Sequence, residues 1–199
     1  MNIYLLRHGE TSYNADGNKY CGRTDIPLTE KGIKQAEAAR KILENVKITK
    51  VYSSPLQRAL QTAEIVSKNR DVVVDDRLIE VDFGNWEGKT REEFIKENSS
   101  LWEKWNEDPT YARAGGIGET ASEIIERADS FYSELKQSSN NENILVVAHN
   151  GINRLYLAHK LGMNLKDYRR IVQENSSITL FTIDENHEFF LKLLNSKGV

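Results

Sequence analysis

Short apolar runs alternate with longer stretches of helical periodicity along most of this chain, and this alternation limits its fold more than any other feature. Strands separated by helices favour a parallel sheet, because a parallel crossover needs a connection about as long as a helix. The sequence therefore predicts an α/β fold, a three-layer sandwich whose mostly parallel sheet carries helices on both faces. We expect strands at about 2–6, 49–53, 71–75 and 143–148, and helices at about 29–45, 55–68, 90–106, 120–138 and 152–161.

Helix starts and the end of the chain carry more specific signals. Three segments have the residue pattern of a helix N-terminus, namely Ser54-Pro55 with Gln57, Thr90 with Glu93, and Thr120 with Glu123. Near the C-terminus, SITLFTIDENHEFFLKLL predicts a β-hairpin that turns near Glu185-Asn186. The Trp- and Gly-rich segment at about 84–119 interrupts the alternation. We therefore expect one domain, residues 1–199, with this segment inserted as a small helical and loop lid.

Composition narrows the classes of partner. The chain has 27 Lys and Arg against 30 Asp and Glu, a formal charge of −3, and no long run of either sign. A nucleic-acid or anionic-membrane partner is therefore disfavoured. The longest apolar runs, such as ILVVA at 144–148, are far shorter than the roughly 20 residues that span a bilayer. A single cysteine, Cys21, excludes internal disulfides, and the chain opens on a strand instead of a leader segment, so we expect a soluble cytoplasmic protein.

Polar and charged side chains follow the predicted strands at the points where they end. Ligands of a parallel α/β sheet bind beyond the carboxyl ends of the strands, so these groups are expected to converge on one site. They are Arg7-His8-Gly9-Glu10, Ser53-Ser54 with Arg58 one turn into the next helix, Glu80 beyond the third strand, and His149-Asn150-Gly151.

The residue types at this predicted site suit a phosphate group. Arg7 and Arg58 repel each other unless an anion lies between them, and their planar guanidinium groups match phosphate oxygens. The N-terminus of the helix at Ser54-Pro55 would add N–H donors. One neutral histidine, His8 or His149, could attack phosphorus while the other, protonated, binds phosphoryl oxygens. This chemistry requires neither a metal nor a cofactor, and the expected substrate is a small phosphorylated metabolite.

An alkoxide leaving group must also receive a proton. Glu80 is the candidate general acid, with Asp82 and Glu87 as further carboxylates nearby in the sequence. We expect Glu80 to be protonated mainly while phosphate is bound, so that activity falls at alkaline pH.

Several motifs, in this order along almost the whole chain, resemble those of the histidine phosphatase superfamily, which is also called phosphoglycerate mutase-like. A bare RHG triplet would be a weak signal, whereas the full set is highly specific. The motifs are RHGET at 7–11 with Asn14, GRTDIPLTEKG at 22–32, SSPLQRALQTA at 53–63, Glu80 followed by FGNWEG at 83–88, GET at 118–120, and AHNG at 148–151.

The resemblance assigns roles to individual residues. It implies that His8 carries the phosphoryl group as a phosphohistidine and that Glu80 is the proton donor. The phosphate pocket would consist of Arg7, Arg58 and His149. Further phosphate contacts are implied for Asn14 and for the backbone near Asn150. The alcohol half of the substrate would be read by the lid and by the loop at Cys21, Gly22 and Arg23.

Departures from the family pattern bear on the substrate. Cofactor-dependent mutases of this superfamily have arginine, histidine and tyrosine directly after the acid, and a basic pair that grips the substrate carboxylate. Here Val81-Asp82-Phe83 follows Glu80 and no Arg-Arg pair follows in the lid region, so a mutase is disfavoured. The pattern is most similar to α-ribazole phosphatases of cobalamin synthesis, with phosphoserine and broad-specificity phosphatases nearby. The run GGIGET at 115–120 is longer than the usual GGES, which affects the expected lid contacts.

Competing interpretations of single motifs are weaker. A metal site built from His8, His149 and a carboxylate is disfavoured, because the neighbouring arginines repel a cation. A cysteine phosphatase loop would need arginine six residues after Cys21, where Pro27 stands. GIGETA at 116–121 imitates a dinucleotide fingerprint but does not follow a predicted strand. A protein that binds a phospho-ligand without turnover remains an alternative function. A homodimer formed through an edge strand is a possible oligomeric state.

Four other residues are expected to be structural rather than functional. Trp102 and Trp105 could form a substrate lid, but packing of the lid helices is the favoured interpretation. His159 and His187 are expected to be structural or surface residues. For Glu10, capping or structural hydrogen bonding and a role in orienting the site are equally plausible.

Overall fold

The computed structural model of the chain describes residues 1–68, 70–138, 142–186 and 188–198. Its described strands form a six-stranded sheet in the order β3-β2-β4-β1-β5-β6. Strands β1 to β4 pair in parallel, whereas β5 is antiparallel to both β1 and β6. The predicted α/β fold with its C-terminal hairpin is thereby confirmed. The strand bounds are β1 Asn2–Arg7, β2 Lys50–Ser53, β3 Val72–Val74, β4 Asn143–Ala148, β5 Ile178–Ile183 and β6 Phe189–Ser196.

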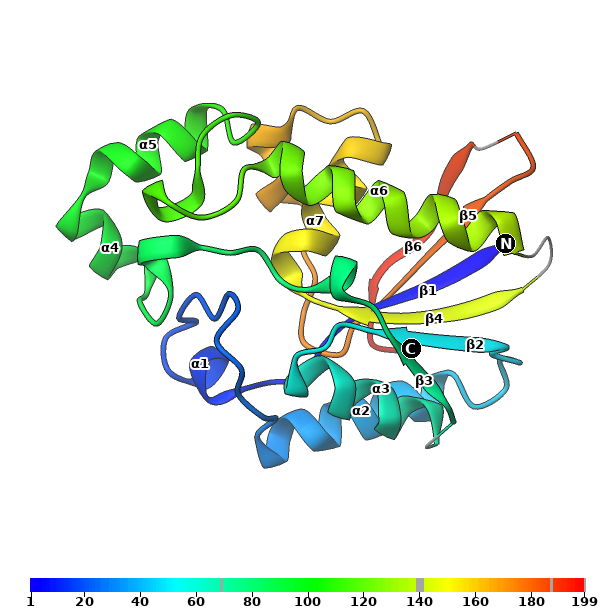
Figure 1. Cartoon of the computed structure of the whole chain (residues 1–199). Coiled ribbons are helices and arrows are strands. Elements are labelled where there is room, and N and C mark those ends of the chain that lie inside the picture. Colours follow the sequence, from blue (N-terminus) through cyan, green and yellow to red (C-terminus); the bar gives the residue numbers. More distant parts are fainter. Residues whose placement is uncertain (69, 139–141, 187, 199) are drawn as a thin grey trace.

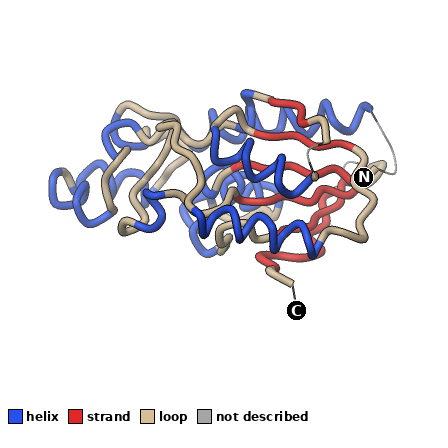
Figure 2. The backbone as a smooth tube through the Cα atoms, turned by 90° about the horizontal axis from the view of Figure 1, so that it is seen from below, coloured by secondary structure: helices blue, strands red, loops and turns tan. Residues whose placement is uncertain are grey.

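Helices cover both faces of this sheet, as the sequence predicted. Figure 1 shows α2 (Glu30–Ile42) and α3 (Gln57–Ser67) below the sheet, and α6 (Ala121–Ser138) and α7 (Asn150–Lys160) above it. Figure 2 shows the molecule from below, where helices and strands overlap along the direction of view. The shorter elements are α1 Ser12–Ala15, η1 Asp76–Leu78, η2 Gly84–Trp86, α4 Arg91–Glu97, α5 Ser99–Glu107, η3 Ala114–Gly116 and η4 Leu165–Arg170.

The core has two parts because successive residues of a strand point to opposite faces of a sheet. In β1, Leu5 packs in the cluster beneath α6 and α7, and Leu6 packs in the cluster over α2 and α3. The first cluster continues beyond the sheet into segment 84–119 through Trp86, Phe94 and Trp105, which are at most 2 % exposed. This burial explains Trp105 by packing, as expected.

Segment 84–119 lies beyond the carboxyl ends of the parallel strands, where α4 and α5 project to the left in Figure 1. This is the end of the sheet at which the sequence placed a lid. Treating the segment as an insertion within a single domain stays a prediction. None of the described helices is both long and apolar enough to cross a membrane.

Two of the three predicted helix caps are present. Thr90 with Glu93, and Thr120 with Glu123, each exchange both hydrogen bonds of a capping box. The third prediction, at Ser54-Pro55 with Gln57, is wrong. Helix α3 begins at Gln57, and its N-cap residue has no side-chain capping bond.

The backbone N–H groups at the start of α3, which were expected to bind phosphate, have partners within the protein. The backbone N–H of Gln57 donates to Asp25 Oδ1 at 2.7 Å, and the N–H of Leu56 donates to Ser54 Oγ at 3.3 Å. These donors are therefore satisfied within the protein. The sequence missed Asp25 because it lies 32 residues away from the helix start. Helix α7 also begins earlier than predicted, at Asn150, which makes His149 its N-cap residue.

The loop after β1 lies directly against the first turn of α2. A Cβ atom at Gly9 would stand 2.5 Å from the carbonyl oxygen of Gly32, and one at Gly32 would stand 2.2 Å from the carbonyl oxygen of Glu10. Neither backbone can move without disturbing the strand end or the helix start. This contact therefore fixes the position of the residues that follow β1.

Replacing Gly9 with alanine should force these backbones apart. We expect Gly9→Ala to lower the free energy of unfolding by about 3 kcal/mol, the upper end of the usual cost of overpacking. Gly162→Ala is the control, because Gly162 has a positive φ of +66° but nothing within 4 Å of an added Cβ. It should lose only about 1 kcal/mol from backbone strain. Urea unfolding of both variants measures the difference, and equal losses would contradict the close contact.

Candidate active site

The four predicted strand ends meet at one place. The ring centroids of His8 and His149 are 5.1 Å apart. The Nε atom of Arg58, from α3, lies 3.2 Å from His149 Nδ1. Arg7 and Glu80 join His8 in lining a pocket of about 240 Å³. Arg58 and His149 are not among the residues that line this pocket. Except for the half-buried Arg7, these side chains belong to residues no more than 6 % exposed, so the site is built from desolvated charged and polar groups.

Hydrogen bonding of His8 selects one ring nitrogen for attack. Its Nδ1 lies 2.7 Å from the carbonyl oxygen of Gly9, which can only accept, so Nδ1 carries the proton. The Nε2 atom then has a free lone pair. Burial, followed by the charges of Arg58 and Arg7, holds the pKa of His8 well below its ordinary value. His8 is therefore a neutral imidazole with a nucleophilic Nε2.

His149 is also neutral, which corrects the expectation of a protonated second histidine. Its Nδ1 must accept the bond from Arg58 Nε, because a guanidinium group cannot accept. The proton is thus on Nε2, which lies 2.7 Å from Ser54 Oγ. Burial and then the charge of Arg58 lower the pKa of His149 well below its ordinary value. In this arrangement His149 orients Arg58 and does not act as a cation.

Both predicted arginines are held mainly by backbone carbonyl oxygens. Arg58 donates from Nη1 to Thr24 at 2.8 Å and from Nη2 to Gly22 at 2.6 Å. Arg7 donates from Nη1 to Gln173 at 2.9 Å, while its Nε is buried without a partner among the described residues. Burial lowers the pKa of Arg7 to about 10. Carbonyl partners leave the guanidinium charges uncompensated, which favours an anionic ligand.

Glu80 is fixed at the N-terminus of α7. Its carboxylate oxygens accept three backbone N–H bonds, from Val81 at 2.9 Å, Gly151 at 3.0 Å and Ile152 at 3.1 Å. A Cβ atom at position 151 would stand 2.6 Å from Glu80 Oε1, so the glycine of the AHNG motif leaves room for this contact. The helix terminus and the carboxylate attract each other.

The other two carboxylates considered as acids serve different contacts. Asp82 Oδ1 accepts the backbone N–H of Gly84, and Glu87 accepts the backbone N–H groups of Arg23 and Thr24. Neither of the two carboxylates lines the pocket, so Glu80 alone of the three is placed to reach a ligand there.

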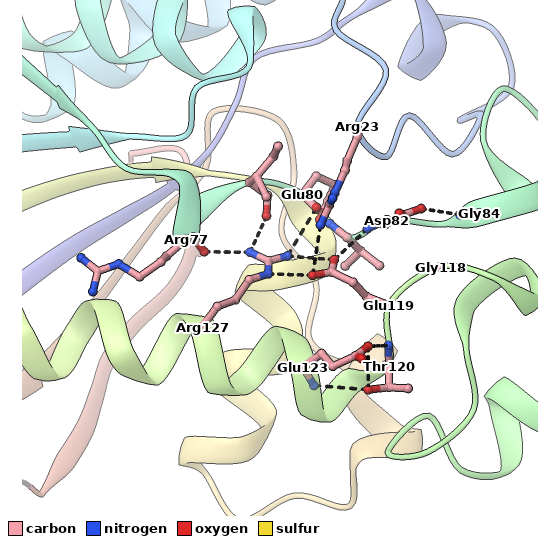
Figure 3. Close-up of polar contacts among 12 residues, drawn as sticks. Arg23, Arg77, Glu80, Asp82, Gly84, Gly118, Glu119, Thr120, Glu123 and Arg127 are labelled. Atoms are coloured by element: carbon pink, nitrogen blue, oxygen red, sulfur yellow. Dashed lines mark hydrogen bonds and ion pairs between the residues drawn. The ribbon is translucent and has the colours of Figure 1, made fainter.

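An ionic network behind Glu80, which the sequence did not predict, holds the segment that carries it. Arg127 on α6 donates to the carbonyl oxygens of Arg77 and Ile79, each at 2.7 Å. Figure 3 shows Arg127 pointing toward Arg77, Glu80 and Glu119. The Nε of Arg127 donates to Glu119 at 3.0 Å, and Glu119 also accepts the backbone N–H of Asp82 at 2.9 Å. Glu119 lies within the GET motif, which was a usable signal, whereas nothing distinguished Arg127 from other charged helix residues.

Three of the residues expected to bind substrate face the pocket. Asn14, Cys21 and Asn150 line it. Asn14 Oδ1 accepts from the backbone of Thr11 at 3.1 Å and from the amide of Asn175 at 3.2 Å, which fixes the orientation of the side chain. Asn150 Oδ1 is buried without a partner among the described residues. Burial raises the pKa of the Cys21 thiol to about 11, so it stays protonated and unsuited to nucleophilic attack.

The remaining two expected substrate contacts, Gly22 and Arg23, do not line this pocket. The carbonyl oxygen of Gly22 accepts from Arg58, and the side chain of Arg23 pairs with Glu119 at 3.2 Å. These two residues therefore contact other residues of the site instead of the pocket itself. The sequence in turn missed six lining residues that come from separate segments of the chain, namely Asn18, Lys19, Tyr20, Arg154, Tyr168 and Arg169, together with Phe83 after the acid.

Residues set aside as structural take part in local contacts. Glu10 pairs with Lys31 at 2.6 Å and accepts from Thr29 at 3.1 Å. His159 pairs with Asp129 at 3.3 Å on the surface. His187 lies outside the described residues. Within the described ranges, no group of three or more His, Cys, Asp or Glu side chains is placed to hold a metal ion.

The depressed pKa values of His8 and His149 have a consequence for stability. In the unfolded chain a histidine takes up a proton below about pH 6.5, whereas these two remain neutral in the folded protein. The free energy of unfolding should therefore fall as pH decreases below about 6.5, by about 1 kcal/mol per pH unit for each group. Urea unfolding between about pH 6 and pH 5 should give a shallower pH dependence for His8→Ala and for His149→Gln than for the wild type. Parallel pH profiles for the three proteins would show that these histidines titrate normally.

Comparison with known proteins agrees with this geometry. The model of the histidine phosphatase superfamily (branch 1) matches residues 3–197. The chain is 32% identical to phosphoserine phosphatase 1 of Hydrogenobacter thermophilus, over 97% of this chain and 92% of that protein. It is also 32% identical to the adenosylcobalamin/alpha-ribazole phosphatase of Escherichia coli, over 100% of this chain and 98% of that protein.

Solved structures give the same result. A mutant of phosphoserine phosphatase from Entamoeba histolytica, in complex with phosphoserine, superposes with a TM-score of 0.89 at 28% identity, covering 98% of this chain and 97% of that one. The phosphatase expected from the sequence is thereby confirmed at the level of the family. With its motifs in order, its fold matched and its strand-end residues gathered around one pocket, the chain belongs to the histidine phosphatase superfamily, branch 1.

Proposed function

We propose that this protein is a metal-independent phosphomonoesterase that hydrolyses a small phosphorylated metabolite through a phosphohistidine at His8. The observation that carries the proposal is the state of His8, which lines the pocket with its Nδ1 proton bound to Gly9 and its Nε2 lone pair free. Arg7 and Arg58 lie beside it and provide the positive charge that a transferring phosphoryl group requires.

In the first step, His8 Nε2 forms a bond to phosphorus and the bond from phosphorus to the alcohol oxygen breaks. Glu80 gives its proton to that oxygen, so the alcohol leaves neutral. The guanidinium groups of Arg7 and Arg58 stabilise the charge on the phosphoryl oxygens, and His149 keeps Arg58 in position through the Nε contact at 3.2 Å.

In the second step, water attacks the phosphohistidine and the bond between nitrogen and phosphorus breaks. Glu80, now a carboxylate, accepts the proton of the water. His8 returns to its neutral form, and inorganic phosphate leaves. The side-chain amide of Asn14 and the backbone N–H of Asn150 are the further groups proposed to bind phosphoryl oxygens.

Alternative activities share the first step and differ in the acceptor. A mutase would return the phosphoryl group to a second hydroxyl and would need a bisphosphorylated primer. A binding protein would keep the pocket without turnover, although both the nucleophile and the acid are present here. Among phosphatases, the pattern of the chain supports an α-ribazole phosphate, phosphoserine or broad-specificity enzyme. The cytoplasmic location and the homodimer stay predictions from the sequence.

The proposed activity can be tested by phosphate release. Wild type should hydrolyse p-nitrophenyl phosphate and at least one of α-ribazole 5′-phosphate, phosphoserine and 3-phosphoglycerate, with EDTA present and no metal added. His8→Ala should lower kcat by about a thousandfold or more, because the thiol of Cys21, which also lines the pocket, stays protonated and cannot replace the imidazole. Conversion of 3-phosphoglycerate only with a bisphosphoglycerate primer would establish the mutase instead. Loss of activity in EDTA that zinc or magnesium restores would contradict metal independence.

The role of Glu80 can be tested by the dependence on leaving group. Glu80→Gln should lower kcat for phosphoserine by about 100-fold or more, because an alkoxide must be protonated. With p-nitrophenyl phosphate the same variant should release a rapid burst of about one p-nitrophenolate per site, since this leaving group needs no proton, followed by slow dephosphorylation. Stopped-flow absorbance measures the burst.

Asp82→Asn is the matched control, because asparagine keeps the oxygen that accepts from Gly84 and Asp82 does not line the pocket. It should behave as the wild type on both substrates. If Asp82→Asn lost activity toward phosphoserine and Glu80→Gln kept it, the general acid would be Asp82.

A further inference from the structure

Beyond the phosphate-binding groups, the pocket has two arginines that the proposed reaction does not use. Arg154 and Arg169 line the pocket together with His8 and Glu80. They also line an adjoining open groove of about 400 Å³, so they stand where the pocket continues toward the surface.

Arg154 is held in place without a charged partner. It follows Asn150 by four residues on α7, one helical turn further along, and both side chains line the pocket. Its Nε donates to the carbonyl oxygen of Tyr168 at 3.5 Å, and its guanidinium carbon lies 5.1 Å from the centre of the Tyr168 ring. Among the described residues it forms no ion pair. Burial lowers its pKa, and the charge of Arg169 contributes in the same direction.

Arg169 is fixed by aromatic rings from two separate elements. Its guanidinium carbon lies 4.3 Å from the ring centre of Trp102 in α5 and 4.6 Å from that of Tyr168 in η4. Its Nη1 donates to Asn106 Oδ1 at 3.3 Å, while its Nη2 is buried without a partner in the described part of the chain. Trp102, which sequence patterns assigned to packing, therefore also orients a pocket arginine.

The side chains in and beside the pocket carry more positive than negative charge. The four guanidinium groups of Arg7, Arg58, Arg154 and Arg169 face the single carboxylate of Glu80, and the remaining pocket cation, Lys19, is already paired with Asp16. These cations outnumber the single carboxylate, and the excess is larger when Glu80 carries the proton that the proposed first step requires. A phosphate dianion therefore leaves positive charge that a further anionic group can neutralise.

We propose that Arg154 and Arg169 bind a carboxylate of the substrate, so that the preferred substrates are phosphomonoesters of small hydroxy acids. This inference rests on the proposed function, because it concerns the leaving group of the same reaction. The planar guanidinium fork matches a carboxylate with paired hydrogen bonds. The free Nη2 of Arg169 and the unpaired charge of Arg154 are available for such bonds. The basic pair that the lid region lacks is thus supplied by α7 and η4.

Two pairs of substrates that differ in one group test the inference. O-phosphoserine and O-phosphoethanolamine differ by the carboxylate, and 3-phosphoglycerate and glycerol 3-phosphate differ by a carboxylate against a hydroxymethyl group. The wild type should prefer the acid of each pair by roughly 10- to 100-fold in kcat/KM, the range expected for charge-assisted hydrogen bonds. Arg154→Met and Arg169→Met should reduce this preference by about tenfold or more through a higher KM for the acid. For the partner that lacks the carboxylate, the loss of kcat/KM in these two variants should be clearly smaller than for the acid.

Arg170→Met is the matched control. Arg170 is the exposed neighbour of Arg169, pairs with Asp167 at 3.2 Å and does not line the pocket. It should keep the preference of the wild type. A wild type that hydrolyses both members of each pair equally well would overturn the inference while leaving the phosphatase reaction intact, and so would a preference that survives in both arginine variants.

Binding without turnover separates the inference from the proposed reaction. Calorimetry with His8→Ala protein should show tighter binding of 3-phosphoglycerate than of glycerol 3-phosphate, again by roughly 10-fold or more. Adding Arg154→Met to this variant should remove the difference. Selective binding without any hydrolysis by the wild type would support the carboxylate site and overturn the proposed function. Equal binding of the two ligands would overturn the carboxylate site whatever the activity.

Discussion

The parallel pairing of β1 with β4 is the constraint on which the site depends. In this register Arg7 stands opposite Ala148, so the residues that follow the two strands, His8 and His149, come out side by side. The close contact of Gly9 with Gly32 fixes the first of these strand ends, and the start of α7 fixes the second. Neither histidine could be displaced without breaking strand pairing in the centre of the sheet.

The charged groups of the site are buried away from water, so they need hydrogen bonds from the protein, and the backbone provides most of them. The carbonyl oxygens of Gly22 and Thr24 hold Arg58, and three N–H groups hold Glu80. These contacts orient the charges without neutralising the arginines by a carboxylate. A buried guanidinium group with only carbonyl partners is costly in free energy, and a bound anion recovers that cost. The backbone contacts thus hold the arginines in positions where they can bind phosphate.

Much of this arrangement could be predicted from the sequence, because it follows from local patterns. The strands, the parallel order and the residues at strand ends depend on periodicity within short windows, and the AHNG and RHGET motifs identify the histidines. The state of His149 could not be predicted, since it depends on burial and on contacts with Arg58 and Ser54, which lie 91 and 95 residues away in the sequence. The wrong cap of α3 has the same origin, because Asp25 reaches the helix from another segment.

Arg154 and Arg169 show the same limit at the substrate end of the pocket. In the sequence they are ordinary basic residues of a helix and a loop, and only the fold places them beside His8. Trp102 illustrates how one residue serves two purposes, since its ring packs against Trp86 and also contacts the guanidinium group of Arg169. Patterns of apolar residues predict the packing contact but give no information about the cation.

The proposed reaction depends on transfer of the phosphoryl group to Nε2 of His8. The most direct measurement is to mix Glu80→Gln protein with p-nitrophenyl phosphate, stop the reaction in base after the burst, and locate the phosphate by ³¹P NMR and peptide mass spectrometry. The proposed reaction predicts a phosphoryl group on Nε2 of His8 that is stable in base and lost in acid. A phosphoryl group on another residue or on Nδ1 of His8 would contradict it, and so would p-nitrophenolate release with no phosphorylated protein at any time.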